Sequence, residues 1–478
     1  MSQLRVLYHP QIGTTIARYV VVGTLLFWPL QAGCVSHRQM VEQARDQYWH
    51  GSFAEAESNL AQARKRPKKD TEVLKLDQAM VHFSQGELAE SATLLREVRN
   101  HFERPAIAGA AQKATSYLTD DNTRPYVGED HEKILVRVLL TMIDLARQQG
   151  DAVAYAHQVG ESIEELLASR EPAPTPPTES ENVAVAETSP PEQSVQPPVD
   201  IVKEELAIAP LLRALVRKSS RMNQDEVLRN LKVATEWRSN SPFLMQELLA
   251  SAEHQDIAPG NGSVYLIMFV GRGPVKQSVT EPVTSQALLI ADQLLSAVGE
   301  YSLPPTIAPV KIAAMVPSPC NVDGMQVSIG GQVVGNTETI ADLNRLAVAR
   351  HQELLPQIIA RAVVRRVVKK SVVVATKSQT NVQSELVSTA YNLAGVLWEA
   401  SEQADLRCWS LLPGQIQILR VDLPAGVHRL VLYPTWHGQL ARAEPLEGNV
   451  EVKDGQTTFA IGTMLDRDQP GTLYSPRQ

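Results

Sequence analysis

The feature that most constrains this chain is a stretch at residues 171–200 that is unsuited to packing in a core. It contains eight prolines and six acidic residues but no basic residue. Proline removes backbone donors and the like charges repel, so we expect a disordered, extended linker, with a docking peptide as the alternative. At about 3.1 Å per residue its reach would be on the order of 90 Å. We therefore expect two parts that fold separately.

The N-terminus has the three-part pattern of an export signal. Arg5 and Arg18 form a basic head without acids, residues 19–30 are apolar, and two small residues precede Cys34. This ending is similar to a bacterial lipobox, in which the cysteine is lipidated, although Gln31 departs from that pattern. An uncleaved single-pass anchor and a coincidental apolar segment are the alternatives.

The expected lipid would hold the chain outside the cytoplasm. Val35, rather than an aspartate, follows Cys34, so the sequence carries no signal for retention in the inner membrane. We expect a periplasm-facing protein that is lipid-anchored to a membrane of the cell envelope, with the outer membrane favoured over the inner.

A helical repeat follows at 38–170. In two units, thirty-five residues apart, a glycine precedes a large apolar residue and then a small one, close to the tetratricopeptide (TPR) period of about 34 residues. A third glycine unit is one place out of register. The residues expected to set the repeat packing are Gly51, Phe53, Ala56, Gly86, Leu88, Ser91 and Gly150. Such repeats stack into a solenoid whose concave face binds protein segments, while a plain helical bundle is the alternative.

The remainder predicts helices at 201–255 and then an α+β domain. The continuous apolar run at 263–270, between two glycines, is typical of a buried strand. We expect further strands at 310–316, 325–334, 417–423, 429–433, 449–452 and 457–463, a hairpin turn at 423–428, and helices at 284–299, 338–374 and 382–403.

The fold class is therefore multidomain: an all-α TPR-like repeat, a disordered linker and a C-terminal α+β domain. The expected divisions are 1–33 (signal peptide), 34–37 (lipidated N-terminus), 38–170 (TPR-like repeat), 171–200 (linker), 201–255 (helical segment) and 256–478 (α+β domain).

Composition and motifs exclude several function classes. The net charge of −8 speaks against binding nucleic acid through phosphate contacts. The histidines form neither of the paired patterns typical of a metal site, and no Gly-x-Ser-x-Gly elbow is present. Cys320 and Cys408 are expected to be buried thiols or a disulfide. We expect no catalytic residue, no metal and no cofactor.

Two basic segments remain as candidates for contacts. The segment Gly271–Lys276 lacks the spacing of a phosphate loop, and Pro274 removes a donor that such a loop needs. It predicts a turn after a strand, with Arg272 and Lys276 as candidate ligand contacts. Residues 357–377 predict a helix with basic residues on one half and valines on the other. A core-facing helix is favoured there over one that lies on lipid.

Several short motifs together resemble a family of bacterial TPR-containing lipoproteins. They are Tyr126–Glu129 with Glu132 and Lys133, Gly150 and Asp151, Gly271–Lys276, Arg407–Pro413 and Leu423–His428. The resemblance implies an envelope component. We therefore expect a non-enzymatic scaffold that binds envelope proteins through its repeats. An envelope hydrolase or transferase with a site in the α+β domain is the alternative, and a deep pocket with convergent titratable groups would favour it.

Overall fold

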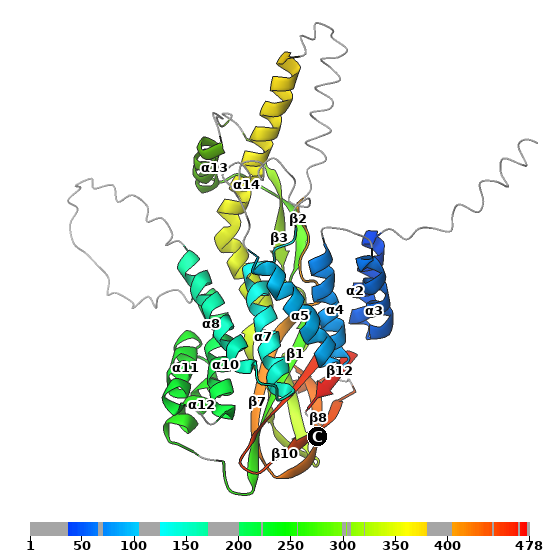
Figure 1. The fold of residues 1–478 in the computed structure, drawn as a ribbon, viewed down its shortest axis with the longest axis vertical. Coiled ribbons are helices and arrows are strands. Elements are labelled where there is room, and N and C mark those ends of the chain that lie inside the picture. Colours follow the sequence, from blue (N-terminus) through cyan, green and yellow to red (C-terminus); the bar gives the residue numbers. More distant parts are fainter. Residues whose placement is uncertain are drawn as a thin grey trace, which may run out of the picture.

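A computed structural model describes residues 37–65, 70–104, 125–170, 200–220, 223–255, 257–298, 303, 307–319, 321–379, 404–441, 444–466 and 469–475. Cys34, Cys320, most of the expected linker and the expected helix at 382–403 lie outside these residues. The chain forms an N-terminal helical region followed by a C-terminal region of mixed sheets and helices. Figure 1 shows the helices from α4 to α8 beside the long strands β1 and β7.

The helices of the N-terminal half are α2 (His37–Trp49), α3 (Phe53–Arg64), α4 (Thr71–Ser84), α5 (Leu88–Phe102), α7 (Asp130–Ala146), α8 (Ala152–Ser169), α9 (Ile201–Glu205), α10 (Ile208–Ser219), α11 (Gln224–Trp237) and α12 (Pro242–Ala252). The later helices are α13 (Ser285–Val298) and α14 (Leu343–Gln379). From α2 to α12, each helix packs on the next one along the chain. The exception is the short α9, since α8 contacts α10 directly.

The glycines at the helix turns have the geometry that the repeat pattern predicts. Gly51 and Gly86 have φ values of 76° and 78°, which favour glycine because they lie in the left-handed region. Ala56 and Ser91 are fully buried behind them. Gly150 differs, since the left-handed residue of the third turn is Gln148, with φ of 54°.

The strands are β1 (Asn261–Arg272), β2 (Val275–Glu281), β3 (Val310–Val316), β4 (Gly324–Ile329), β5 (Gln332–Asn336), β6 (Glu338–Asp342), β7 (Pro413–Pro424), β8 (Gly426–Trp436), β9 (Gln439–Leu440), β10 (Leu446–Val452), β11 (Thr457–Asp466) and β12 (Gln469–Tyr474). One sheet has the order β12-β11-β1-β7-β6, a second has the order β10-β8-β4-β5, and β2 pairs with β3 alone. In the first sheet β1 runs parallel to β11 and antiparallel to β7.

Strand β1 is central because both of its faces are buried. Its side chains at Tyr265, Ile267 and Phe269 belong to the core shared with the helices. The alternating side chains from Val264 to Val270 belong to the core shared with the second sheet. Since successive strand side chains point to opposite faces, a strand buried on both faces has a continuous apolar sequence. The protein is thus layered: helices, first sheet, second sheet.

Several boundaries differ from the expectation. Residues 338–342 form strand β6, so the long helix begins only at Leu343. The expected strand at 325–334 is instead the hairpin β4–β5, which turns at Gly330 and Gly331, both with positive φ. The expected hairpin at 423–428 is wrong, because β7 and β8 belong to different sheets and the chain crosses between them there. The predicted turn within Gly271–Lys276 falls at Gly273 and Pro274, between the end of β1 at Arg272 and the start of β2 at Val275.

The ends of the expected linker lie together. The Arg170 guanidinium is 2.7 Å from the Asp200 carboxylate and 2.6 Å from that of Glu353 in α14. Helix α8 also contacts α10 directly. One hydrophobic core includes side chains from both halves of the chain. The expected separation of two independently folded parts is not observed, because the helices bury their apolar faces against the first sheet.

Candidate functional site

Two regions are compared as candidates for binding, and the first is the face of the N-terminal helices that meets the first sheet. The first helices of the second and third pairs, α4 and α7, are the most buried helices of this region. Phe83 of α4 packs edge-to-face on Phe269 of β1, with ring centroids 5.0 Å apart. The Leu411 backbone N–H donates to Asp77 at 3.3 Å, and Thr472 donates to the Ser84 carbonyl at 2.7 Å. The chain's own sheet thus fills this face.

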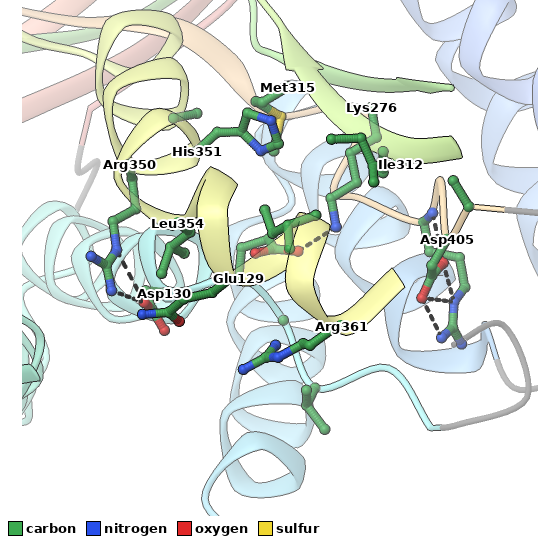
Figure 2. A pocket seen from close by; sticks show the side chains of 18 of the residues that line it. Glu129, Asp130, Lys276, Ile312, Met315, Arg350, His351, Leu354, Arg361 and Asp405 are labelled. Carbon is green, nitrogen blue, oxygen red and sulfur yellow. Dashed lines mark hydrogen bonds and ion pairs between the residues drawn. The ribbon is translucent and has the colours of Figure 1, made fainter. Parts of the chain in front are cut away.

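The second surface is a cavity of about 580 Å³, here called the α14 cavity. It lies where the segment before α7, the β2–β3 pair and the first half of α14 meet. Its charged lining residues are the bases Lys276, Lys311, Arg350, Arg361, Arg365 and Arg407 and the acids Glu129, Asp130 and Asp405. In Figure 2 the labelled side chains from these elements surround one space.

Each acid of the α14 cavity is paired with a base from another element or from the same turn. Lys276 donates to Glu129, which lies 147 residues earlier in the chain. The Arg350 guanidinium is 3.0 Å from Asp130, and that of Arg407 is 2.7 Å from Asp405. The first two of these contacts, dashed in Figure 2, join α7 and the segment before it to β2 and to α14.

The segment before α7 is fixed by a network of buried hydrogen bonds. Glu129 and Glu132 form a capping box at the start of α7, which satisfies backbone donors that the helix leaves unpaired. Tyr126 donates to Glu132, which also accepts the Trp409 backbone N–H at 2.8 Å. At Gly128, with φ of 72°, an added Cβ would lie 2.7 Å from Phe102, so the site requires glycine.

Burial and pairing set the charge states around the cavity. Burial would raise the pKa of Glu129, but the Lys276 ammonium and its hydrogen bond outweigh it and lower that pKa. Burial would lower the pKa of Lys276, and Glu129 raises it instead. For His131 and His351 burial prevails and lowers each pKa, so both imidazoles are neutral at pH 7.

Of the two predicted ligand contacts, only Lys276 reaches the cavity. Arg272 instead places its guanidinium 5.0 Å from the Trp49 ring centroid, where a cation–π contact ties β1 to α2. Arg272 therefore does not line the α14 cavity. Arg361 belongs to the basic segment 357–377, whereas Glu129, Asp130, Arg350 and His351 were not among the predicted contacts. The sequence does hold a signal for this site. Three of the motifs that carry the family resemblance, Tyr126–Glu129, Gly271–Lys276 and Arg407–Pro413, each contribute residues to the cavity.

Other sequence features find structural roles. The valines at 363, 364 and 368 are buried against α13 and β3, so the described part of the basic helix faces a core, as favoured. Cys408 is buried and burial raises its pKa, which disfavours the reactive thiolate. Within the described ranges, no group of three histidine, cysteine or acidic side chains is placed to hold a metal ion.

The described helices also include none with the length and apolar character needed to cross a bilayer. Comparisons with protein-family models, with curated proteins and with solved structures find no significant match to this chain.

Proposed function

We propose that the protein is a non-enzymatic, lipid-anchored component of the bacterial cell envelope that binds a partner protein at the α14 cavity. The cavity carries this proposal, because it brings charged side chains from three distant segments to one accessible space. Concave sites with a few convergent polar groups are where proteins usually bind ligands. The groove of the repeats is the weaker candidate, since the first sheet already covers α4 and α7.

The helical region is best interpreted as TPR-like repeats that support the sheet. The left-handed glycines Gly51 and Gly86 and the buried small residues Ala56 and Ser91 support this interpretation. In this proposal the repeats hold one wall of the cavity rigid, since the capping box at Glu129 begins a repeat helix. The chain would accordingly belong with the TPR-containing lipoproteins that its motifs resemble.

An envelope hydrolase or transferase is the second candidate, and the convergent titratable groups of the cavity are the observation that favours it. The described lining, however, contains no serine, threonine or cysteine to act as a nucleophile. His351 has no carboxylate hydrogen-bonded to it within the described chain, so nothing there orients it as a general base. Binding without chemistry explains the side chains better.

The anchoring half of the proposal rests on the lipobox-like end of the first 34 residues. Changing Cys34 to serine removes the lipid acceptor, and we expect the variant to leave the membrane fraction after a salt wash. Each buried methylene of an acyl chain contributes about 0.8 kcal/mol to membrane binding, so losing the lipid removes most of the anchoring. A variant that still sediments with membranes would favour the uncleaved anchor.

The binding half is tested by capturing partners from solubilised envelope membranes with the full-length protein. Arg361→Glu reverses an exposed charge in the cavity, and Arg229→Glu makes the same change on the exposed face of α11. We expect a partner captured by the wild type and by the α11 variant to be lost with Arg361→Glu. Equal capture by all three proteins would place the partner site elsewhere.

A further inference from the structure

The α14 cavity carries more positive charge than its own acids neutralise. Six basic residues line it against three acidic ones, in a chain whose net charge is −8. Lys276, Arg350 and Arg407 are each paired with one of the acids. Among the described residues, the pairing leaves the positive charges of Lys311 and Arg361 as a surplus that faces the cavity.

Two of the remaining bases lack a partner in the described part of the chain. Lys311 lies on β3 and Arg361 lies on α14, and both side chains line the cavity and reach solvent. Neither forms a hydrogen bond or an ion pair with any described residue. Arg365, one helical turn beyond Arg361, also lines the cavity and is 8% exposed. Donors on two separate walls can therefore bind one group between them.

Two histidines add hydrogen-bonding groups that no described residue of the chain uses. His131 is only 4% exposed and lines the cavity without making a side-chain hydrogen bond to any described residue. His351 lines the same space from α14, and Figure 2 shows its ring beside Met315. A neutral imidazole offers one donor and one acceptor, so both rings suit a ligand that carries oxygen atoms.

The cavity also has an apolar side. Ile312, Met315, Leu354 and Ile358 line it between the charged residues. A purely polar ion would leave these side chains in contact with water, whereas burying apolar surface contributes roughly 25 cal/mol per Å² to binding. The lining thus fits a ligand that combines an anionic group with an apolar portion.

We propose that the α14 cavity binds a phosphate ester with an apolar portion, the phosphate between Lys311 and Arg361 and the apolar portion against Ile312 and Leu354. This inference goes beyond the proposed function, because it assigns a phosphate ester, in addition to the partner protein, to the same cavity. A phosphate monoester carries a charge of about −1.5 to −2 at pH 7 and three acceptor oxygens. A carboxylate carries one charge and two oxygens, so it compensates less of the surplus. Arginine also binds phosphate through two parallel hydrogen bonds.

The ester could come from a soluble molecule or from a lipid headgroup, and the chemistry at the cavity is the same. The test uses the full-length protein in detergent and measures binding of phenyl phosphate by isothermal titration calorimetry. Benzoate serves as the matched carboxylate. Flotation with phosphatidylcholine vesicles, with and without phosphatidic acid, distinguishes the lipid source.

The test uses one double variant, which carries both Lys311→Ala and Arg361→Ala. The control is Arg229→Ala on α11. We expect phenyl phosphate to bind at least about tenfold more tightly than benzoate, and the double variant to weaken it about tenfold or more, as for charge-assisted hydrogen bonds. The control should bind like the wild type. Extra flotation with phosphatidic acid would support the lipid source, and binding of phenyl phosphate alone would support the soluble one.

The proposal is overturned if phenyl phosphate does not bind, if benzoate binds as tightly, or if the double variant binds as the wild type does. Unfolding curves of the variants check that the fold is intact, since both replaced side chains are exposed. The result is separable from the proposed function. Partner capture that depends on Arg361, without phenyl phosphate binding, would leave the protein-binding role standing and remove only the phosphate ligand.

Discussion

The helical face on the first sheet and the α14 cavity differ in what lines them: the first is covered by the chain's own sheet, and the second keeps exposed basic side chains. On the repeat face apolar rings meet, as at Phe83 and Phe269, and the acid Asp77 is fully buried and bonded to Arg45 and Leu411. In the cavity the acids are also paired, but Lys311 and Arg361 remain exposed. A face of stacked helices is therefore not evidence of a partner site by itself, because a protein can cover that face with its own sheet.

The largest effect is expected from removing the aromatic contact on the filled face. Phe83→Ala deletes a ring that is 3% exposed, and such truncations typically cost about 3–5 kcal/mol. Calorimetry should show a single unfolding transition at a lower temperature, because helices and sheet share one core. Leu289→Ala, at a side chain that is 69% exposed, serves as the control and should have little effect. A second transition that Phe83→Ala leaves unmoved would show that the two halves unfold independently.

A smaller effect is expected behind that face, in the packing between repeat helices. Ala56 is fully buried in α3, so Ala56→Trp should overpack the contact and lower the free energy of unfolding by about 1–3 kcal/mol. Ala54→Trp places the same ring on the exposed side of α3. Chemical denaturation of both variants compares them. Equal stabilities would mean that Ala56 is not at a helix–helix contact, and the repeat interpretation would fail.

On the cavity side, a pH-dependent effect is expected from His131. Burial lowers its pKa below the ordinary value of 6.5, although Glu132 and Glu129 oppose this. Below that value the unfolded chain binds a proton that the folded chain does not, so stability falls as the pH falls. The contribution is at most about 1.4 kcal/mol per pH unit.

Unfolding curves at pH 7.5 and 5.5 measure this loss. His131→Asn should lose less stability between the two pH values than the wild type, while His351, whose pKa burial also lowers, keeps its own contribution. Identical losses in variant and wild type would show that His131 takes up its proton as readily when folded as when unfolded.

The smallest effect is expected from shortening the segment between α8 and α9. Since Arg170 and Asp200 are in contact, replacing residues 172–198 with six glycine and serine residues should leave the fold intact. Loop-closure entropy predicts a gain of only about 1 kcal/mol. Thermal unfolding of the two chains gives the comparison. If shortening instead lowered the free energy of unfolding by several kcal/mol, the segment would have to pack on the rest of the protein.

The sequence predicted those elements whose structure depends on residues close together in the chain. The apolar run at 263–270 identified β1, and Gly51 and Gly86 marked real helix turns, because strand burial and turn geometry depend on neighbouring residues. The hairpin at 423–428 was wrong for a long-range reason. Which sheet β8 joins depends on its pairing with β4 and β10, and a local turn motif does not contain that information.

The cavity was harder to predict because its parts are scattered along the chain. Asp130 and Arg350 form an ion pair across 220 residues, and neither belongs to a motif with a characteristic spacing. Lys276 and Arg272 were both predicted as contacts because they belong to the same glycine-rich segment. Only Lys276 lines the cavity, whereas the Arg272 guanidinium packs on the Trp49 ring. Charge and flexibility allow a long side chain to reach either place, so only the folded arrangement decides between them.

The parallel pairing of β1 with β11 has a consequence for how the protein is made. Ser263 lies beside Thr457, so the central strand waits for almost two hundred further residues before its sheet is complete. Until β11 is available, the apolar side of α7 lacks the strand that covers it. Nascent chains that expose such surfaces aggregate readily.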